Sequence, residues 1–175
     1  GQLRWKFPTD GGVATTPAIA EEENLVVAGS NDFSIYAVDI RGGRQNWKLT
    51  TQGPIRCSPT VAHGHVFFGS DDHKFYAVRV ATGRAAWKYD AGSPIRRRPA
   101  LTDDMIIFGT DLGDVVALDL SGQLKWRFKT KRAVMSSPVV YEGIVFFGSG
   151  DTHLYALEAK NGWSVWRYRT GKSVI

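Results

Sequence analysis

Residues 37–47 read AVDIRGGRQNW, and the same pattern returns three more times along the chain. The other copies lie at residues 77–87 (AVRVATGRAAW), 117–126 (ALDLSGQLKW) and 156–166 (ALEAKNGWSVW). Each copy begins with Ala, has an acidic residue or Arg two positions later, and ends with a Trp four residues after a Gly. A period of about 40 residues predicts a protein built from repeated structural units.

The residues outside this pattern keep the same period. A Pro follows four tryptophans by twelve residues, and a Gly ends the next apolar run. The tryptophans are Trp5, Trp47, Trp87 and Trp126, the prolines are Pro17, Pro59, Pro99 and Pro138, and the glycines are Gly29, Gly69, Gly109 and Gly148. No segment has the apolar period of a helix. Each repeat instead consists of four short runs of β-forming residues separated by turn residues. In the second repeat the four runs are 55–61, 65–70, 74–79 and 85–90. We therefore expect an all-β protein.

Four antiparallel strands in a unit of about 40 residues are typical of the blades of a β-propeller. A β-sandwich would not keep a fixed long period, and helical repeats would need a helical pattern. We expect one propeller region over residues 1–175, with blades at about 13–50, 55–90, 95–129 and 134–169. Residues 1–7, which surround Trp5, are predicted to form one extra strand of the outermost type.

The Ala-x-Asp, Gly and Trp pattern resembles the tryptophan-docking motif of the repeat found in pyrroloquinoline-quinone (PQQ) enzymes, and the resemblance covers essentially the whole chain. The Gly-His and Trp-Asp pairs of WD40 repeats do not recur. The PQQ-type family includes quinoprotein dehydrogenases, an outer-membrane assembly lipoprotein and sensor domains of bacterial kinases. The resemblance implies a structural docking role for Trp5, Trp47, Trp87, Trp126 and Trp166. Arg79 departs from the motif at its acidic position, so we expect its turn to be held differently or its edge to contact a partner.

The expected function is that of a non-catalytic binding or scaffold module for protein interaction or ligand sensing. By resemblance it would belong to a larger bacterial or archaeal protein, such as a receptor kinase with an extracytoplasmic sensor domain. The alternatives are an envelope scaffold of the outer-membrane assembly type and a fragment of a PQQ-dependent dehydrogenase. Such an enzyme needs a Ca²⁺ site and a vicinal disulfide, and Cys57 is the single cysteine. We therefore expect neither PQQ nor Ca²⁺ nor another metal.

Two features of the sequence are candidates for binding. Arg96 and Arg98, with Arg56 at the equivalent position one blade earlier, are predicted to form an anion or ligand site at the central channel. The alternative is that these arginines pair with acidic turn residues such as Asp72. Trp163 lies where the other copies have Arg44, Arg84 and Gln123, so it is a candidate interaction residue, with local packing as the alternative.

The remaining residues of note have structural interpretations. Asp32, Asp72 and Asp151 recur three residues after the strand-ending Gly and are expected to cap turns. The four histidines (His63, His65, His73 and His153) are expected to be exposed turn residues, because the signal for zinc is weak. Lys and Arg residues are scattered rather than aligned in a stripe, so we expect no nucleic-acid partner despite a net charge of +5. No apolar run reaches the roughly 18–20 residues of a membrane helix.

The number of predicted strands does not determine how the ring of blades closes. The four blades are followed by the start of another first strand, which ends at Ile175, and the strand around Trp5 has no blade of its own. We expect either that the chain is part of a longer propeller or that two chains form an eight-bladed ring. Its partner would then be the remaining blades, another protein, or a second copy.

Overall fold

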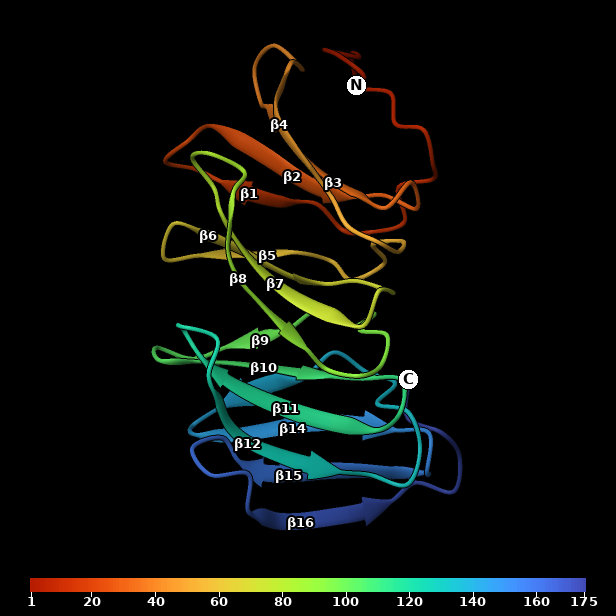
Figure 1. Cartoon of the computed structure of the whole chain (residues 1–175). Coiled ribbons are helices and arrows are strands. Elements are labelled where there is room, and N and C mark those ends of the chain that lie inside the picture. The colour runs from red at the N-terminus through yellow and green to blue at the C-terminus, as the bar shows by residue number, and fades with distance from the viewer.

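The computed structural model describes all residues 1–175 and contains sixteen strands in four antiparallel sheets of four strands each. In every sheet the strands lie side by side in the order of the chain. Figure 1 shows the four sheets stacked one after another, from blade 1 at the red end of the chain to blade 4 at the blue end. The all-β, four-stranded blade architecture is thereby confirmed. The fold has no helix, so none is long and apolar enough to cross a membrane.

The bounds of the strands follow the repeat. Blade 1 holds β1 (Ala18–Ala20), β2 (Leu25–Gly29), β3 (Ser34–Asp39) and β4 (Gln45–Thr50). Blade 2 holds β5 (Thr60–Ala62), β6 (His65–Gly69), β7 (Lys74–Arg79) and β8 (Ala85–Asp90). Blade 3 holds β9 (Ala100–Leu101), β10 (Met105–Gly109), β11 (Asp114–Asp119) and β12 (Leu124–Lys129). Blade 4 holds β13 (Val139–Tyr141), β14 (Ile144–Ser149), β15 (His153–Glu158) and β16 (Ser164–Arg169).

The first strand of each blade is shorter than the sequence predicts. The strand expected over 55–61 begins only at Thr60, and residues 51–59 form a linker from the preceding blade. Pro54 and Pro59 lack the N–H group that a sheet ladder needs. The Ile55 N–H instead donates to the Ser30 carbonyl of blade 1, at 3.0 Å. The linkers therefore fasten each blade to the blade before it.

The hydrophobic core consists of three clusters, and each cluster lies between two consecutive blades. Between blades 1 and 2, Ile35 and Trp47 pack with Ile55 and Phe68. No hydrogen bond and no core cluster joins blade 1 to blade 4. The four blades thus form an open arc, and the outward faces of blade 1 and blade 4 have no neighbouring blade in this chain.

The strand predicted over residues 1–7 is not formed. A fourth strand of a blade pairs with the third, and β3, β7, β11 and β15 already have β4, β8, β12 and β16 beside them. Residues 1–7 therefore find no third strand that lacks a fourth strand beside it. The segment nevertheless lies over blade 1, where Phe7 and Tyr36 make an edge-to-face contact with ring centroids 5.4 Å apart.

Candidate functional site

Three tryptophans join a blade to the blade that follows, and Trp5 joins the N-terminal segment to blade 1 in the same way. The indole N–H groups donate to backbone carbonyls at 2.5 to 2.9 Å: Trp5 to Ile40, Trp47 to Val80, Trp87 to Leu120 and Trp126 to Ala159. The bond satisfies the single polar group of a large buried ring. Trp166 makes no such bond and is 43% exposed, because no blade follows it in this chain.

The Gly of each repeat forms the surface on which the Trp ring rests. A Cβ atom on Gly83 would lie 2.6 Å from the Trp47 ring, and Gly43, Gly122 and Gly162 are equally close to Trp5, Trp87 and Trp126. These glycines also have positive φ, +69° at Gly83, which side chains disfavour. The Ala of the motif lies opposite the Trp in the same sheet, as in the Ala37–Trp47 pair. The repeating motif is therefore an interface between blades.

The acidic residue of the motif caps the same turn. Asp39 accepts the backbone N–H groups of Arg41 and Gly42, and Asp119 accepts those of Ser121 and Gln123. Blade 2 has Arg79 there, and its turn is held differently, by the Thr82 hydroxyl accepting the Arg84 N–H at 3.3 Å. Arg79 itself is exposed. Its proposed role as a contact residue stays a prediction.

The second recurring group is a pair of Asp and Tyr four residues apart. Tyr36, Tyr76 and Tyr155 donate their hydroxyls to Asp32, Asp72 and Asp151 at 2.6 to 2.7 Å. Burial raises the pKa of Tyr155 to about 12, assisted by Asp151. Burial alone would raise the pKa of Asp151, but the hydrogen bonds from Tyr155 and the backbone hold it below its ordinary value. The predicted turn-capping role is confirmed for Asp32 and Asp72, which accept the N–H groups of Ser34 and Lys74, whereas Asp151 accepts the Lys131 N–H of the preceding linker instead. The tyrosine partners were not foreseen.

The predicted arginine site is an arrangement of ion pairs along the loops between blades. Asp71 accepts both the Nη1 of Arg56 (3.1 Å) and the Nε of Arg96 (2.8 Å). Arg96 extends its Nη1 to Asp111 of the next blade, also at 2.8 Å. Arg56 reaches back to the Asn31 side chain of blade 1 at 3.4 Å. The row therefore connects three consecutive blades through side chains that remain partly exposed.

Arg98 does not join this row. It is exposed, and its Nε donates to the Thr60 hydroxyl at 3.1 Å. Between the two, the Arg97 carbonyl accepts the Cys57 thiol at 3.1 Å, and the Nε of Arg97 is buried without a partner. Burial raises the pKa of the Cys57 thiol to about 12, so the thiol is protonated at neutral pH. The structure thus brings Arg56 and Arg96 together and leaves Arg98 apart from them.

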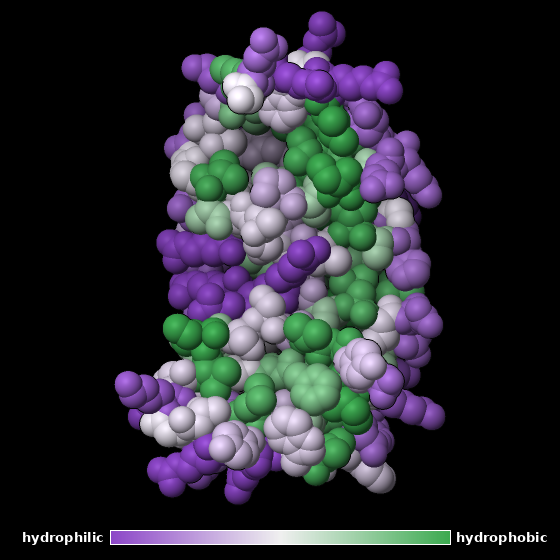
Figure 2. All heavy atoms as spheres, turned by 180° about the vertical axis from the view of Figure 1, so that it is seen from behind, coloured by the Kyte–Doolittle hydropathy of each residue, from purple (hydrophilic) through white to green (hydrophobic).

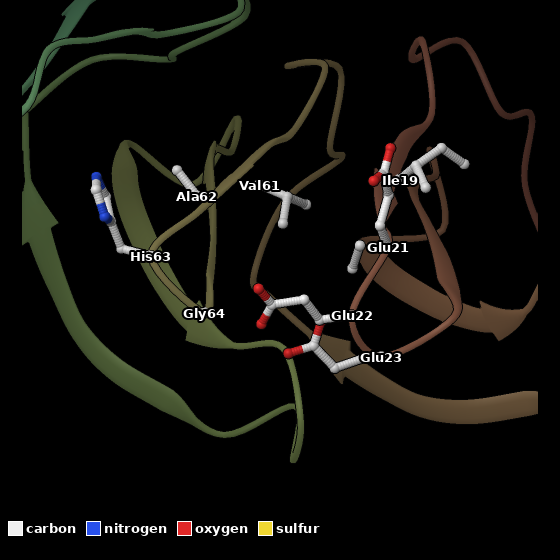
Figure 3. A pocket seen from close by; sticks show the side chains of 9 residues that line it. Ile19, Glu21, Glu22, Glu23, Val61, Ala62, His63 and Gly64 are labelled. Atoms are coloured by element: carbon white, nitrogen blue, oxygen red, sulfur yellow. The ribbon is translucent and has the colours of Figure 1, made fainter.

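A groove on the opposite end of the blades lies between the β1–β2 and β5–β6 turns. It is lined by Glu21, Glu22, Glu23 and His63, with Val61 among its apolar walls. Figure 3 shows the Glu22 and Glu23 carboxylates facing the groove, while the His63 ring points away from them. No group of three or more His, Cys, Asp or Glu side chains is placed to hold a metal ion.

The four histidines are divided between two environments. His63 and His73 are exposed turn residues with positive φ, as predicted, whereas His65 and His153 are half-buried at the starts of strands. His153 lies beside Asp151, with its Nδ1 3.4 Å from the Asp151 Oδ1. The prediction of four exposed turn histidines is therefore correct for two of them.

The outward face of blade 4 carries exposed apolar and aromatic side chains. Val139, Tyr141, Trp166 and Tyr168 are 43–66% exposed, and the Trp166 and Phe146 rings lie 5.9 Å apart. Figure 2 shows apolar and pale aromatic side chains gathered at the lower end of the molecule, where blade 4 lies. Trp163 is 71% exposed, so it does not pack locally. Contact of Trp163 with a partner stays a prediction.

At the outward face of blade 1, residues 1–17 cover part of the sheet. A small apolar cleft lies between Trp5, Phe7 and Val13 on one side and Val26 and Tyr36 on the other. Val13 is 49% exposed. This face is therefore also apolar and only partly covered.

Four-stranded blades joined by tryptophans that rest on glycine turns define a β-propeller of the PQQ-like repeat class. The family model described as outer membrane protein assembly factor BamB matches residues 1–120 and, again, residues 93–174. The chain belongs to this family.

Individual relatives match shorter stretches. The assembly factor BamB of Bordetella pertussis is 41% identical over 54 residues, which are 31% of this chain and 14% of that protein. The quinoprotein ethanol dehydrogenase of Pseudomonas aeruginosa is 30% identical over 66 residues, which are 37% of this chain and 11% of that enzyme. The crystal structure of BamB from Moraxella catarrhalis superposes with a TM-score of 0.84 at 17% identity. That match covers 96% of this chain and 56% of the Moraxella chain.

The residues present do not fit a PQQ site of the kind the resemblance would imply. Cys57 is a lone buried thiol, four of the docking tryptophans are held by the following blade, and no acidic cluster is available for Ca²⁺. That neither group binds stays a prediction.

Sequence reasoning missed the partner of the arginines. Asp71 and Asp111 take that role, whereas Asp72, the suggested partner, is engaged by Tyr76 and by the Lys74 N–H. A signal was present in the sequence, because Asp71 and Asp111 occupy the same position in consecutive repeats.

Proposed function

We propose that the chain is a non-catalytic propeller module that binds other proteins in the cell envelope, within a machinery that assembles outer membrane proteins. The observation that supports this most strongly is the family match, which runs through all four blades. An extracytoplasmic location is part of the same proposal. The chain spans 56% of the Moraxella relative, so the activity of a whole assembly factor is also a proposal.

The arginine row and its neighbour Arg98 are the surface on which we place the partner. Arg56 and Arg96 are 45% and 37% exposed, and Arg96 is already oriented by two aspartates. Side chains held in place before binding lose little conformational freedom on association. Arg98 has no acidic partner, so it can pair with a carboxylate. The surface suits an acidic segment of a partner protein.

The test uses the chain exported to the periplasm of a Gram-negative bacterium that lacks its own BamB. We expect the chain to co-purify with the outer membrane assembly machinery. Arg98→Glu should weaken co-purification without unfolding the protein, because Arg98 is exposed and makes one side-chain bond. Arg84→Glu is the matched control, since it applies the same charge change to an exposed residue at a β7–β8 turn. Absence of the machinery from the purified folded chain would refute the proposal.

Two other functions stay predictions. A sensor role predicts that a kinase domain is encoded in the same gene, and sequencing of the flanking region would decide it. The dehydrogenase alternative has support from the similarity to the quinoprotein ethanol dehydrogenase over 66 residues. It predicts that PQQ binds the chain, whereas our proposal predicts no change in PQQ absorbance on titration.

A further inference from the structure

We propose that a groove between the outer strands of blades 1 and 2 binds an acidic segment of a partner protein through Lys74 and Lys88. The groove is lined only by residues 49–52 and by residues of β7 and β8, so both of its walls belong to this chain. None of the arginines discussed above lines it. The proposal adds a second binding surface and does not rest on the envelope function.

The groove is large enough for a few residues of an extended peptide. Its volume is about 550 Å³, within the range of about 300–1,000 Å³ that is usual for ligand sites. The end of β4 and the linker after it form one wall, with Leu49 among their residues. Blade 2 forms the other wall, with Lys74, Ala85 and Lys88. Apolar and basic side chains thus line the same space.

The repeat explains why the hollow occurs at this junction. No groove of this kind is present at the outer strands between blades 2 and 3 or between blades 3 and 4. Leu49 is the fifth residue of its outer strand, where the next two blades have the larger side chains Tyr89 and Phe128. Ala85, the first residue of β8, lies where β12 has Leu124. Smaller side chains therefore open the groove on both walls.

The charges also differ from those at the next junction. In blade 3, Asp114 occupies the position of Lys74, and Arg127 occupies the position of Lys88. Asp114 and Arg127 form an ion pair at 3.0 Å, so the two groups neutralise each other. Blade 2 has lysines at both positions, and neither lysine takes part in an ion pair. The groove therefore has two cations and lacks the acidic group of its counterpart.

The aspartates close to Lys74 in the sheet are engaged by other groups. Asp72 accepts the Tyr76 hydroxyl and the backbone N–H of Lys74. Asp90, which is opposite Lys74 in the ladder, accepts the Gly92 N–H at 2.9 Å. Neither carboxylate lies within ion-pair distance of a groove lysine. The ammonium groups are therefore available to a carboxylate from another molecule.

The lining selects an occupant that is both acidic and apolar. Lysine ammonium groups form charge-assisted hydrogen bonds with carboxylates. Leu49 and Ala85 offer an aliphatic surface to a side chain between two such carboxylates, because burial of apolar area is favourable. A protein segment of the type Glu-Leu-Glu carries both kinds of group, whereas an inorganic anion carries charge alone. We therefore assign the groove to an acidic segment with an apolar residue at its centre.

The experiment is an NMR titration of the isotope-labelled whole chain with the capped peptide Ser-Glu-Leu-Glu-Ser, and with Ser-Gln-Leu-Gln-Ser as its neutral counterpart. We expect the acidic peptide to shift the amide signals of residues 49–52 and 74–88, and the neutral peptide to bind about 10-fold more weakly or not at all. Lys74→Ala and Lys88→Ala should each weaken binding by about 3- to 10-fold. Lys125→Ala is the matched control, since it removes an exposed lysine of β12 outside the groove and should change nothing.

Ala85→Leu separates the groove from general attraction between charges. It introduces the side chain that blade 3 has at this position, keeps every charge, and should abolish binding by filling the groove. Four outcomes would overturn the proposal: no shifts in the groove, shifts centred on Arg56 and Arg96 instead, equal binding of the neutral peptide, or unchanged affinity in Ala85→Leu. Thermal melting verifies that each variant is folded. If Ala85→Leu does not fold, the comparison of the two groove lysines with Lys125 decides the question.

Discussion

Substitution of Gly83 by Ala tests the contact between blades, and Gly64→Ala is its matched control. Both glycines have φ of +69°, so both substitutions place an alanine in the same disfavoured conformation. They differ in their surroundings. A Cβ at position 83 would lie 2.6 Å from the Trp47 ring, whereas a Cβ at position 64 meets nothing within 4 Å.

The difference between the two variants isolates the cost of moving the Trp47 ring. The left-handed conformation costs each alanine about 1–2 kcal/mol. Gly83→Ala adds about 1–3 kcal/mol for overpacking. Loss of the Trp47 bond to the Val80 carbonyl adds about 0.5–1.5 kcal/mol. We therefore expect Gly83→Ala to be about 2–4 kcal/mol less stable than Gly64→Ala.

Urea unfolding followed by tryptophan fluorescence measures this difference, and a thermal melt checks it. For a chain of this length, about 2–4 kcal/mol corresponds to a melting temperature roughly 4–16 °C below that of Gly64→Ala. Equal destabilisation of the two variants would refute the reasoning, because it would mean that the ring contact adds nothing to the backbone cost.

Three further predictions concern side chains. Burial alone would raise the pKa of Asp114, but the hydrogen bond from Arg127 holds it below its ordinary value. The Asp114 carboxylate therefore contributes stability above the unfolded-state pKa of about 4, and this contribution is lost as the pH falls through the folded-state pKa. Urea unfolding should show that the parent protein loses more stability than Asp114→Asn between about pH 6 and about pH 3. Arg96→Ala should cost about 1 kcal/mol at low salt and less at high salt, whereas Arg98→Ala should stay within about 0.5 kcal/mol; equal costs would contradict the ion-pair row. Trp163→Ala should remove the fraction of tryptophan fluorescence that acrylamide quenches most readily, and an unchanged quenching curve would contradict its exposure.

The period of the sequence was sufficient to predict the blades, because every marker residue serves the same interface in each repeat. The sequence also predicted the bounds of the later strands, since β7 and β8 begin and end at the predicted residues. The first strands were predicted too long, since a run of apolar residues does not show whether its N–H groups bond within the sheet or to the preceding blade. Ile55 does the latter.

The candidate site was harder to predict for an electrostatic reason. Arg96 and Arg98 were expected to contribute to one site, but both lie in the linker between blades 2 and 3 rather than in a strand. Their directions are set by the available carboxylates, so Arg96 turns to Asp71 and Asp111 while Arg98 turns to Thr60. Whether Asp71 or Asp72 is free to pair with an arginine depends on the other hydrogen bonds that each carboxylate accepts. The sequence alone does not show these bonds.

The offset between Trp and Gly has a consequence for how such chains change in length. Because the Trp of one unit always meets the Gly of the next, a unit of about 40 residues has one half of the contact at each end. A duplicated unit inserted between blades 2 and 3 would present Gly to Trp87 and Trp to the Gly122 turn, so both new junctions would form without any other substitution. Gene duplication can thus change the number of blades by one at a time. Selection then acts on the curvature of the ring rather than on the Trp–Gly contacts between its blades.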